Sequence, residues 1–269
     1  MRTHEKRVVY YTDPLRDDFA GTSIRRKPVG TNFRYRRRDP LWNLLAFLLY
    51  HVIAYPIVWT YARVVFGLRI RNRRALRRLR RGAFLYANHT QMLDPFLLPV
   101  AGFPRKVNPI ANPDAVSIPF LRQVLLMLGC LPIPTERAAI PQFVDAVRAR
   151  VAHGGHVAIY PEAHIWPYYT GIRPFTSTSF HYPVDCGAPA VAVVTTYRRR
   201  GGLIGRFTDR PAITLHVSEP MWPDETLPRR QAIRALRDRV YTFMCETAAS
   251  EPQVEYIQYV QEETALKDA

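Results

Sequence analysis

The sequence predicts an α/β protein with a mostly parallel, mixed sheet flanked by helices, preceded by an apolar helical segment. Three observations support this fold class. Short apolar runs alternate with stretches of helical spacing from residue 82 onward, an uncharged run occupies residues 41–62, and most of the positive charge precedes residue 82. Strands that alternate with helices form layers with a mostly parallel sheet. A chain of 269 residues, 48% of them hydrophobic, is long enough for one large domain with a buried core.

Six apolar runs have the length of strands, and helical patterns separate them. Strands are expected at residues 83–87, 107–111, 130–133, 156–160, 190–197 and 212–217. Helices are expected at residues 95–101, 118–128, 140–153 and from 228 to about 249. We therefore assign residues 82–269 to a single α/β domain.

Positive charge is concentrated in the N-terminal part of the chain. The formal net charge is +16, and residues 1–81 hold 20 Lys or Arg against five Asp or Glu. The arginines cluster at residues 34–38 and 69–81, on either side of the uncharged run. This distribution favours a polyanionic partner, either nucleic acid or an anionic membrane surface. Nucleic acid is the weaker alternative, because the arginines flank an apolar stretch instead of alternating with stacking aromatics.

The uncharged run itself favours the membrane. Its 22 residues are about the length that crosses a bilayer, but Pro56 falls inside it and both flanks are basic. We therefore expect two helices broken near Pro56 and half-sunk into one leaflet, as a monotopic or hairpin anchor with the arginines on anionic membrane lipids. The alternative is a buried core helix beside a solvated basic tail.

The remaining organisation follows from composition. Residues 1–40 are polar and arginine-rich without a sustained period, so we expect a disordered tail there and a membrane-associated segment at residues 41–81. Three widely spaced cysteines predict no disulfide scaffold and favour a reducing compartment, and the first forty residues lack the apolar core of a signal peptide. The expected location is therefore the cytoplasmic face of a membrane.

The most informative chemical pattern lies where the first strand of the domain ends. His89 follows the apolar strand directly, and Asp94-Pro95 is a typical start of a helix. A short loop can fold these two side chains together. A carboxylate next to a histidine fixes its tautomer and stabilises the imidazolium that forms when the ring removes a proton. The pair therefore predicts a general base, although a capping Asp94 and an ordinary loop histidine would have the same spacing.

Asn88-His89 with Asp94 resembles the NH-x4-D motif of the glycerolipid acyltransferases, typified by 1-acylglycerol-3-phosphate acyltransferase. Three further stretches resemble the later motifs of that family, in the same order. They are residues 129–133 (GCLPI), residues 160–162 (YPE) and residues 187–191 (GAPAV). The resemblance implies the glycerolipid acyltransferase fold, with its membrane-associated N-terminus.

The resemblance also implies an activity and roles for named residues. The activity is transfer of a fatty acyl group from acyl-CoA or acyl carrier protein to a hydroxyl of a lysophospholipid or glycerol-phosphate acceptor, in phospholipid biosynthesis, most simply 1-acylglycerol-3-phosphate. His89 would take the hydroxyl proton, Asp94 would orient His89, and Asn88 and Glu162 would belong to the substrate site. No metal and no cofactor are expected beyond the acyl donor.

This chain departs from the family pattern at two places. Thr135 stands where the second motif usually has arginine, and Arg137, two residues later, is the candidate to replace that arginine in the substrate site. The third motif usually continues Glu-Gly-Thr-Arg, whereas here Glu162 is followed by Ala-His-Ile, so the arginine credited with binding the acceptor phosphate is absent. An anionic headgroup needs a cation, preferably a guanidinium. We expect Arg173 to serve instead, with His164 as a weaker candidate.

Three other functions compete with acyl transfer. A metal hydrolase would use His89, Asp94 and Glu162 with one of His153, His156 or His164, but no paired-histidine motif is present. A serine esterase is disfavoured because no Gly-x-Ser-x-Gly occurs. The last alternative is a membrane-associated lipid-binding protein with a degenerate acyltransferase site, which the lost arginine favours and the retained His89 and Asp94 disfavour.

Overall fold

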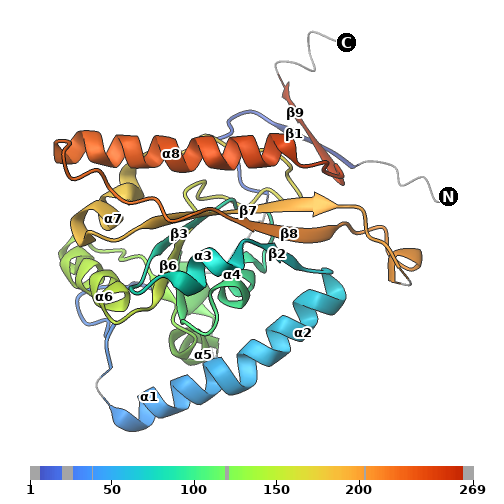
Figure 1. Ribbon diagram of the computed structural model, residues 1–269. Helices are drawn as coiled ribbons and strands as arrows, with labels where there is room; N and C mark the ends of the chain where they lie inside the picture. The colour runs from blue at the N-terminus through green and yellow to red at the C-terminus, as the bar shows by residue number, and fades with distance from the viewer. Residues whose placement is uncertain (1–6, 20–26, 38, 119–120, 203, 263–269) are drawn as a thin grey trace.

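The computed structural model describes residues 7–19, 27–37, 39–118, 121–202 and 204–262. Their centre is a seven-stranded sheet with helices on both faces (Figure 1). The strand order is β2-β8-β7-β3-β6-β4-β5, and all neighbouring strands are parallel except β7 and β8. The strands are β2 (Arg69–Arg71), β3 (Phe84–Ala87), β4 (Val107–Ala111), β5 (Leu131–Pro132), β6 (His156–Ile159), β7 (Ala190–Arg198) and β8 (Ala212–Val217).

The predicted fold class is confirmed, and all six predicted strands are present. The central strands β3, β6, β7 and β8 are almost wholly buried, as expected for a sheet covered on both faces. The edge strand β2 was not predicted, because it is only three residues long and lies within an arginine cluster. The helices of the domain are α3 (Arg73–Arg78), α4 (Asp94–Gly102), α5 (Leu121–Met127), α6 (Ile140–Ala152), α7 (His181–Cys186) and α8 (Arg229–Ser250).

Alternate side chains of each strand fill two separate cores. Phe84 and Tyr86 of β3 belong to the core beneath α6 and α8, whereas Leu85 and Ala87 belong to the core beneath α3 and α4. This is the two-residue period of a strand buried on both sides. The β3 strand therefore sits in the middle of the sheet and ends at a fixed position, which places the residues that follow it.

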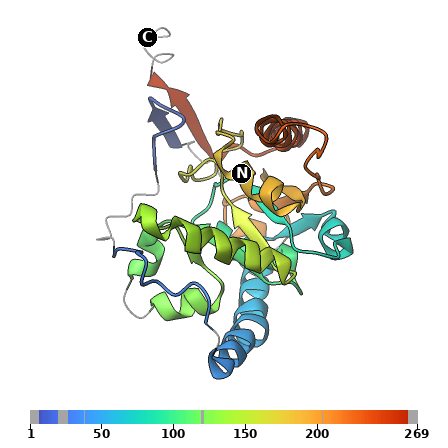
Figure 2. The same ribbon diagram turned by 90° about the vertical axis from the view of Figure 1, so that its left-hand side faces the viewer.

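The expectation of a disordered tail at residues 1–40 was wrong for the residues that the structure describes there. Strand β1 (Arg7–Tyr11) pairs in parallel with β9 (Ile257–Gln261), far away in the sequence (Figure 2). Val29, Phe33 and Tyr35 are buried in the core beneath α6, and the backbone N–H of Val29 donates to Thr135 Oγ1 at 2.9 Å. Sequence patterns do not reveal three isolated apolar side chains as a helix or strand, because they follow no period. Their burial is nevertheless enough to hold this extended segment against the core.

The predicted break near Pro56 was also wrong, because residues Pro40–Val65 form one continuous helix. It consists of α1 (Pro40–Phe47), a π-helical stretch (Leu48–Ala54) and α2 (Tyr55–Val65). Proline normally breaks a helix because it lacks an N–H and its ring clashes with the preceding turn. Here the N–H of Tyr55 bonds to the carbonyl of Tyr50, and this wider turn leaves room for Pro56. A hairpin anchor is therefore excluded.

This long helix contacts the domain along a narrow stripe. Tyr50 Oη accepts a hydrogen bond from Val107 N at 2.9 Å, and the Tyr55 ring stacks on Phe103 with the centroids 3.7 Å apart. Most of the other apolar side chains are exposed, among them Leu41, Leu44, Leu45, Phe47, Leu48, Val52, Ile53, Ile57 and Val64. Within the described part of the chain this is one helix long and apolar enough to cross a membrane, with only 11% of its most apolar window buried. The low burial argues against the alternative of a core helix.

We expect Phe33→Ala to lower the free energy of unfolding by about 3 kcal/mol, because it leaves a cavity beside Tyr35 and Phe143. Its exposed neighbour Asn32 is the matched control, and Asn32→Ala should change stability by less than about 0.5 kcal/mol. Denaturant unfolding measures both. Equal stabilities of the two variants would mean that this segment does not belong to the core.

Candidate active site

The predicted pair of His89 and Asp94 is brought together at the carboxyl end of β3. Helix α4 begins at Asp94, and the short loop from Ala87 turns back so that His89 Nδ1 lies 3.1 Å from Asp94 Oδ2. The same carboxylate oxygen accepts the backbone N–H groups of Thr90 and Gln91, each at 2.8 Å. Asp94 is 3% exposed, so these three contacts fix its position.

These contacts determine which nitrogen of His89 carries the proton. Because Asp94 Oδ2 is an acceptor toward two amides, His89 Nδ1 must be the donor in the contact between them. The Nε2 atom of the neutral ring then carries the lone pair, and it has no hydrogen-bond partner among the described residues. The ring lies against Tyr160, with centroids 4.3 Å apart and planes 24° from parallel. The histidine is thus oriented as a proton acceptor.

A second buried carboxylate holds the same loop from the other side. Glu162 Oε2 accepts the backbone N–H of His89 at 3.0 Å, and Glu162 Oε1 accepts the backbone N–H of Arg173 at 3.0 Å. The Arg173 guanidinium lies 3.3 Å from Glu162 Oε2. Burial raises the pKa of Glu162 above its usual value, and the Arg173 charge and the two amide donors act in the opposite direction. Glu162 therefore positions His89 through its backbone.

The structure does not place Arg173 where the sequence analysis expected it. Arg173 is 1% exposed and does not line the cavity next to His89. Its guanidinium donates to the carbonyls of His164 and Pro14 and lies over the Trp166 ring, 5.0 Å from the centroid. A guanidinium with all these contacts serves as an internal brace, so the prediction that Arg173 binds the acceptor phosphate was wrong.

Three other predicted residues lie away from the cavity. The amide of Asn88 is buried and joins β3 to β7 through two hydrogen bonds with the backbone of Thr195, at 2.8 and 3.1 Å. Arg137 is exposed in a short 3-10 turn, and His164 is half-buried with Nδ1 3.7 Å from Asp18 Oδ2. Asn88 therefore stabilises the end of the sheet, and neither Arg137 nor His164 is among the residues around His89.

The turn after β6 contains one of the departures from the family motif. Ala163 occupies the position where that motif has glycine, and its φ angle is +66°, in the left-handed region. This conformation costs an alanine about 1 kcal/mol relative to glycine. The buried Glu162 beside it and the N–H of His164, which donates to the Glu162 carbonyl at 2.8 Å, hold the turn in place. The backbone turn at Ala163 therefore keeps a left-handed conformation, although alanine replaces the glycine of the motif.

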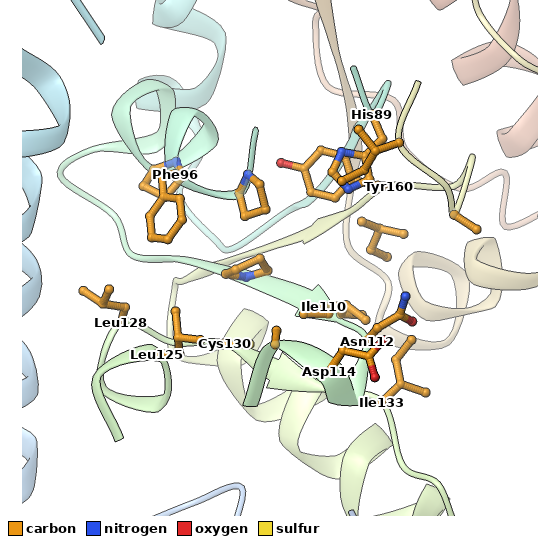
Figure 3. A pocket seen from close by; sticks show the side chains of 18 of the residues that line it. His89, Phe96, Ile110, Asn112, Asp114, Leu125, Leu128, Cys130, Ile133 and Tyr160 are labelled. Carbon is orange, nitrogen blue, oxygen red and sulfur yellow. The ribbon is translucent and has the colours of Figure 1, made fainter. Parts of the chain in front are cut away.

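His89 lies at the edge of a large apolar cavity of about 710 Å³ (Figure 3). The walls come from the N-terminal helix, α4, β4, α5 and the segment before α7, and sequence analysis did not identify them because they are scattered along the chain. Representative lining residues are Tyr50, Tyr55, Val58, Phe96, Pro99, Ile110, Leu125, Leu128, Cys130 and Tyr182. No Lys or Arg of the described residues lines it. The polar groups other than His89 include Asn112, Thr176 and Ser179.

The ligand set of a metal hydrolase is not assembled. Within the parts of the chain that the structure describes, no group of three His, Cys, Asp or Glu side chains is placed to hold a metal ion. His156 starts strand β6 and His153 precedes it, at the end of the sheet away from His89. The arrangement around His89 is a histidine held by one carboxylate at the edge of an apolar cavity.

We expect Arg173→Met to lower the free energy of unfolding by about 3 kcal/mol or more, because it leaves Glu162 buried without its cation. Adding Glu162→Gln should restore part of that loss, and Arg137→Met, at an exposed arginine, should leave stability unchanged. Denaturant titration of the four proteins is the measurement. A fully stable Arg173→Met protein would contradict the bracing role.

Comparisons with known proteins agree with this geometry. Residues 67–196, just under half of the chain, match the family model described as Acyltransferase, and this range contains His89, Asp94, Glu162 and Arg173. No curated protein sequence gives a significant match. Among solved structures, the chain is similar to the 1-acyl-sn-glycerophosphate (LPA) acyltransferase PlsC of Thermotoga maritima. The TM-score is 0.50 and the identity 17%, over 79% of this chain and 99% of that one. The region that matches the family model holds the His89–Asp94 pair, and the structural similarity shows that this chain shares the fold of that enzyme.

Proposed function

We propose that this protein transfers a fatty acyl group from acyl-CoA or acyl carrier protein to a hydroxyl of a lysophospholipid or glycerol-phosphate acceptor. The observation that carries the proposal is the position of His89, whose Nδ1 is held by Asp94 and whose Nε2 has no partner at the edge of an apolar cavity. A cavity of about 710 Å³ with apolar walls suits a fatty chain. The similarity to an enzyme named for 1-acyl-sn-glycerophosphate makes that lysolipid the first acceptor to test.

The proposed chemistry uses the chain's own groups. His89 Nε2 removes the proton of the acceptor hydroxyl as its oxygen attacks the thioester carbonyl. Collapse of the tetrahedral intermediate breaks the C–S bond, forms the ester and returns the proton from His89 to the leaving thiolate. Asp94 stabilises the imidazolium between these two steps. The thioester is already a reactive donor, so the proposed mechanism includes no metal and no redox cofactor.

The protein would work at a membrane, on the cytoplasmic face where soluble acyl donors are available. The support is the helix Pro40–Val65, with its exposed apolar side chains and low burial. One face of this helix lines the cavity through Tyr50, Tyr55 and Val58, while the opposite face is exposed. In this arrangement a lysolipid would leave the bilayer beside the cavity wall.

One observation favours a second candidate function. A lysophosphatidate headgroup needs a cation, and no Lys or Arg of the described residues lines the cavity. The alternative is therefore a lipid-binding protein that retains the fold without turnover. An activity panel with purified protein, one acyl-CoA and several lysophospholipid and glycerol acceptors separates the two, because a binding protein would give no product with any acceptor.

We expect His89→Ala to lower kcat/KM for acyl transfer by about 1000-fold, because the hydroxyl loses its base. Asp94→Asn should lower it by about 100-fold or more, since the amide no longer stabilises the imidazolium. Asp145→Asn, at an exposed carboxylate of α6 remote from the site, is the matched control and should retain full activity. Thioester cleavage and ester formation are followed together. Unimpaired turnover by His89→Ala would refute the proposed mechanism.

The membrane contact calls for point substitutions, because Tyr50, Ala62 and Phe66 of the same segment belong to the buried residues. We expect Leu44→Gln, Leu48→Gln and Val52→Gln together to weaken binding to phosphatidylcholine vesicles at least about 100-fold, since three exposed apolar side chains lose their contact with lipid. The matched control replaces three exposed apolar residues elsewhere, Ile204, Phe207 and Trp222, with Gln. Equal vesicle binding by both triple variants would show that this helix is not the anchor.

A further inference from the structure

A second cavity, which we call the basic cavity, lies at the opposite end of the sheet from His89. Its volume is about 490 Å³, and it is formed by the amino-terminal ends of β4 and β6, the end of α6, the beginning of α1 and residues 33–37. In Figure 1 the beginning of α1 lies on the same side of the molecule as α6. The acyltransferase reaction proposed above uses none of its charged side chains.

The lining of the basic cavity is strongly cationic. Its charged side chains are Arg34, Arg36, Arg37, Arg105, Lys106 and Arg150, joined by His153. No Asp or Glu of the described residues lines it, and none of these six cations forms an ion pair with a described carboxylate. Elsewhere the chain does pair its arginines, as Arg229 does with Asp185 and Arg173 with Glu162. Among the residues that the structure describes, these cations therefore have no counter-charge.

The contacts of the inner cations leave their charge available. Arg150 Nη2 donates to the carbonyl of Tyr35 at 3.2 Å, and Lys106 Nζ donates to the carbonyl of Met127. One buried donor, Arg150 Nε, has no hydrogen-bond partner in the described structure. Neutral carbonyls orient these groups without neutralising them, and a buried polar atom without a partner is costly.

The pKa shifts agree with crowding of like charges. Burial and the nearby Arg150 charge lower the pKa of Lys106 to about 8. Burial and the Arg36 charge lower the pKa of Arg150 below its usual value. Cations that are buried close to one another repel each other, and an anion that binds between them reduces this repulsion.

The surroundings of the cavity indicate what kind of anion. Trp42, Asn43 and Ala46 of α1 line it, and the Arg37 guanidinium lies over the Trp42 ring at 3.8 Å. On the same two turns of α1, Leu41, Leu44, Leu45 and Phe47 are exposed. A basic hollow next to an exposed apolar face matches an amphiphile with an anionic head and apolar tails. A soluble phosphate compound has no apolar part that could contact the exposed apolar face of α1.

We propose that the basic cavity binds the phosphate-bearing headgroup of an anionic phospholipid. It shares Cys130 with the wall of the cavity next to His89, but its cations lie at the other end of the sheet from His89. The ligand chemistry is a phosphate ester held by guanidinium and ammonium groups. The proposal rests on the membrane contact proposed for α1 and is independent of acyl transfer. Occupation of the site would fix the start of α1 against the headgroup layer.

The test compares vesicle binding by the full-length protein, using phosphatidylcholine alone and phosphatidylcholine mixed with phosphatidylglycerol. The variants are Arg36→Gln, at an exposed rim cation whose loss cannot unfold the domain, and Arg150→Gln, at the inner cation. The matched control is Arg148→Gln, which removes the same charge from an exposed position of α6 outside the cavity. We expect the preference for the anionic vesicles to fall about fivefold with Arg36→Gln and about tenfold with Arg150→Gln, and by less than twofold with Arg148→Gln.

Two results would overturn the proposal. Equal losses in all three variants would mean that the vesicles respond to net charge alone, and an unchanged preference in both cavity variants would mean that the cavity holds no lipid.

A second measurement works without a membrane: calorimetric titration with dihexanoyl phosphatidylglycerol, a short-chain lipid soluble as single molecules, and with inorganic pyrophosphate. If the short-chain lipid binds and Arg150→Gln weakens this binding, the result supports the site even when α1 does not bind vesicles. If pyrophosphate binds more tightly than the lipid, the cavity is assigned to a soluble anion instead. Loss of acyl transfer alone, as in His89→Ala, should leave both measurements unchanged.

Discussion

The candidate site depends on how two buried carboxylates hold one short loop. Asp94 and Glu162 both lie beneath the loop that follows β3, and each accepts hydrogen bonds from backbone N–H groups as well as from a side chain. A buried carboxylate is stable only when donors surround it. The loop supplies all three donors to Asp94 and one donor to Glu162, and Arg173 supplies the other two, so the loop conformation and the two acids stabilise each other. The position of the His89 ring is therefore determined by the backbone and not by a mobile side chain.

The apolar helix Pro40–Val65 takes part in both of the cavities described above. Tyr50, Tyr55 and Val58 line the cavity next to His89, whereas Trp42 and Ala46 line the basic cavity at the other end of the helix. The continuous π-helical path through residues 48–54 is what connects these two regions along a single axis. A break at Pro56 would separate them. Lipid contact, the acyl-chain cavity and the anion site thus share one structural element in the proposed function.

The structure shows where the positive charges of the chain lie and which of them are paired. Several arginines are neutralised within the fold, as Arg173 is by Glu162 and Arg71 by Glu251. Others cap carbonyls, as Arg105 does at Gly154 and Leu79. The six cations of the basic cavity, which form no ion pair with a described carboxylate, lie near the beginning of α1 and its exposed leucines. Part of the positive charge is therefore concentrated at one place on the fold.

The sequence by itself determined the α/β class, the six strands and the His89–Asp94 pair, because each depends on local information. Strand and helix periods are read over a few residues, and a strand end followed by His89 and a helix start at Asp94 needs only a short loop to bring the pair together. The tertiary structure alone decided what lies far apart in the chain. It paired β1 with β9, buried Phe33, carried the helix past Pro56 and turned Arg173 inward to Glu162. Each of these outcomes depends on which surface a segment meets after folding, and burial of a charge or an aromatic ring against a distant partner leaves no periodic pattern in the sequence.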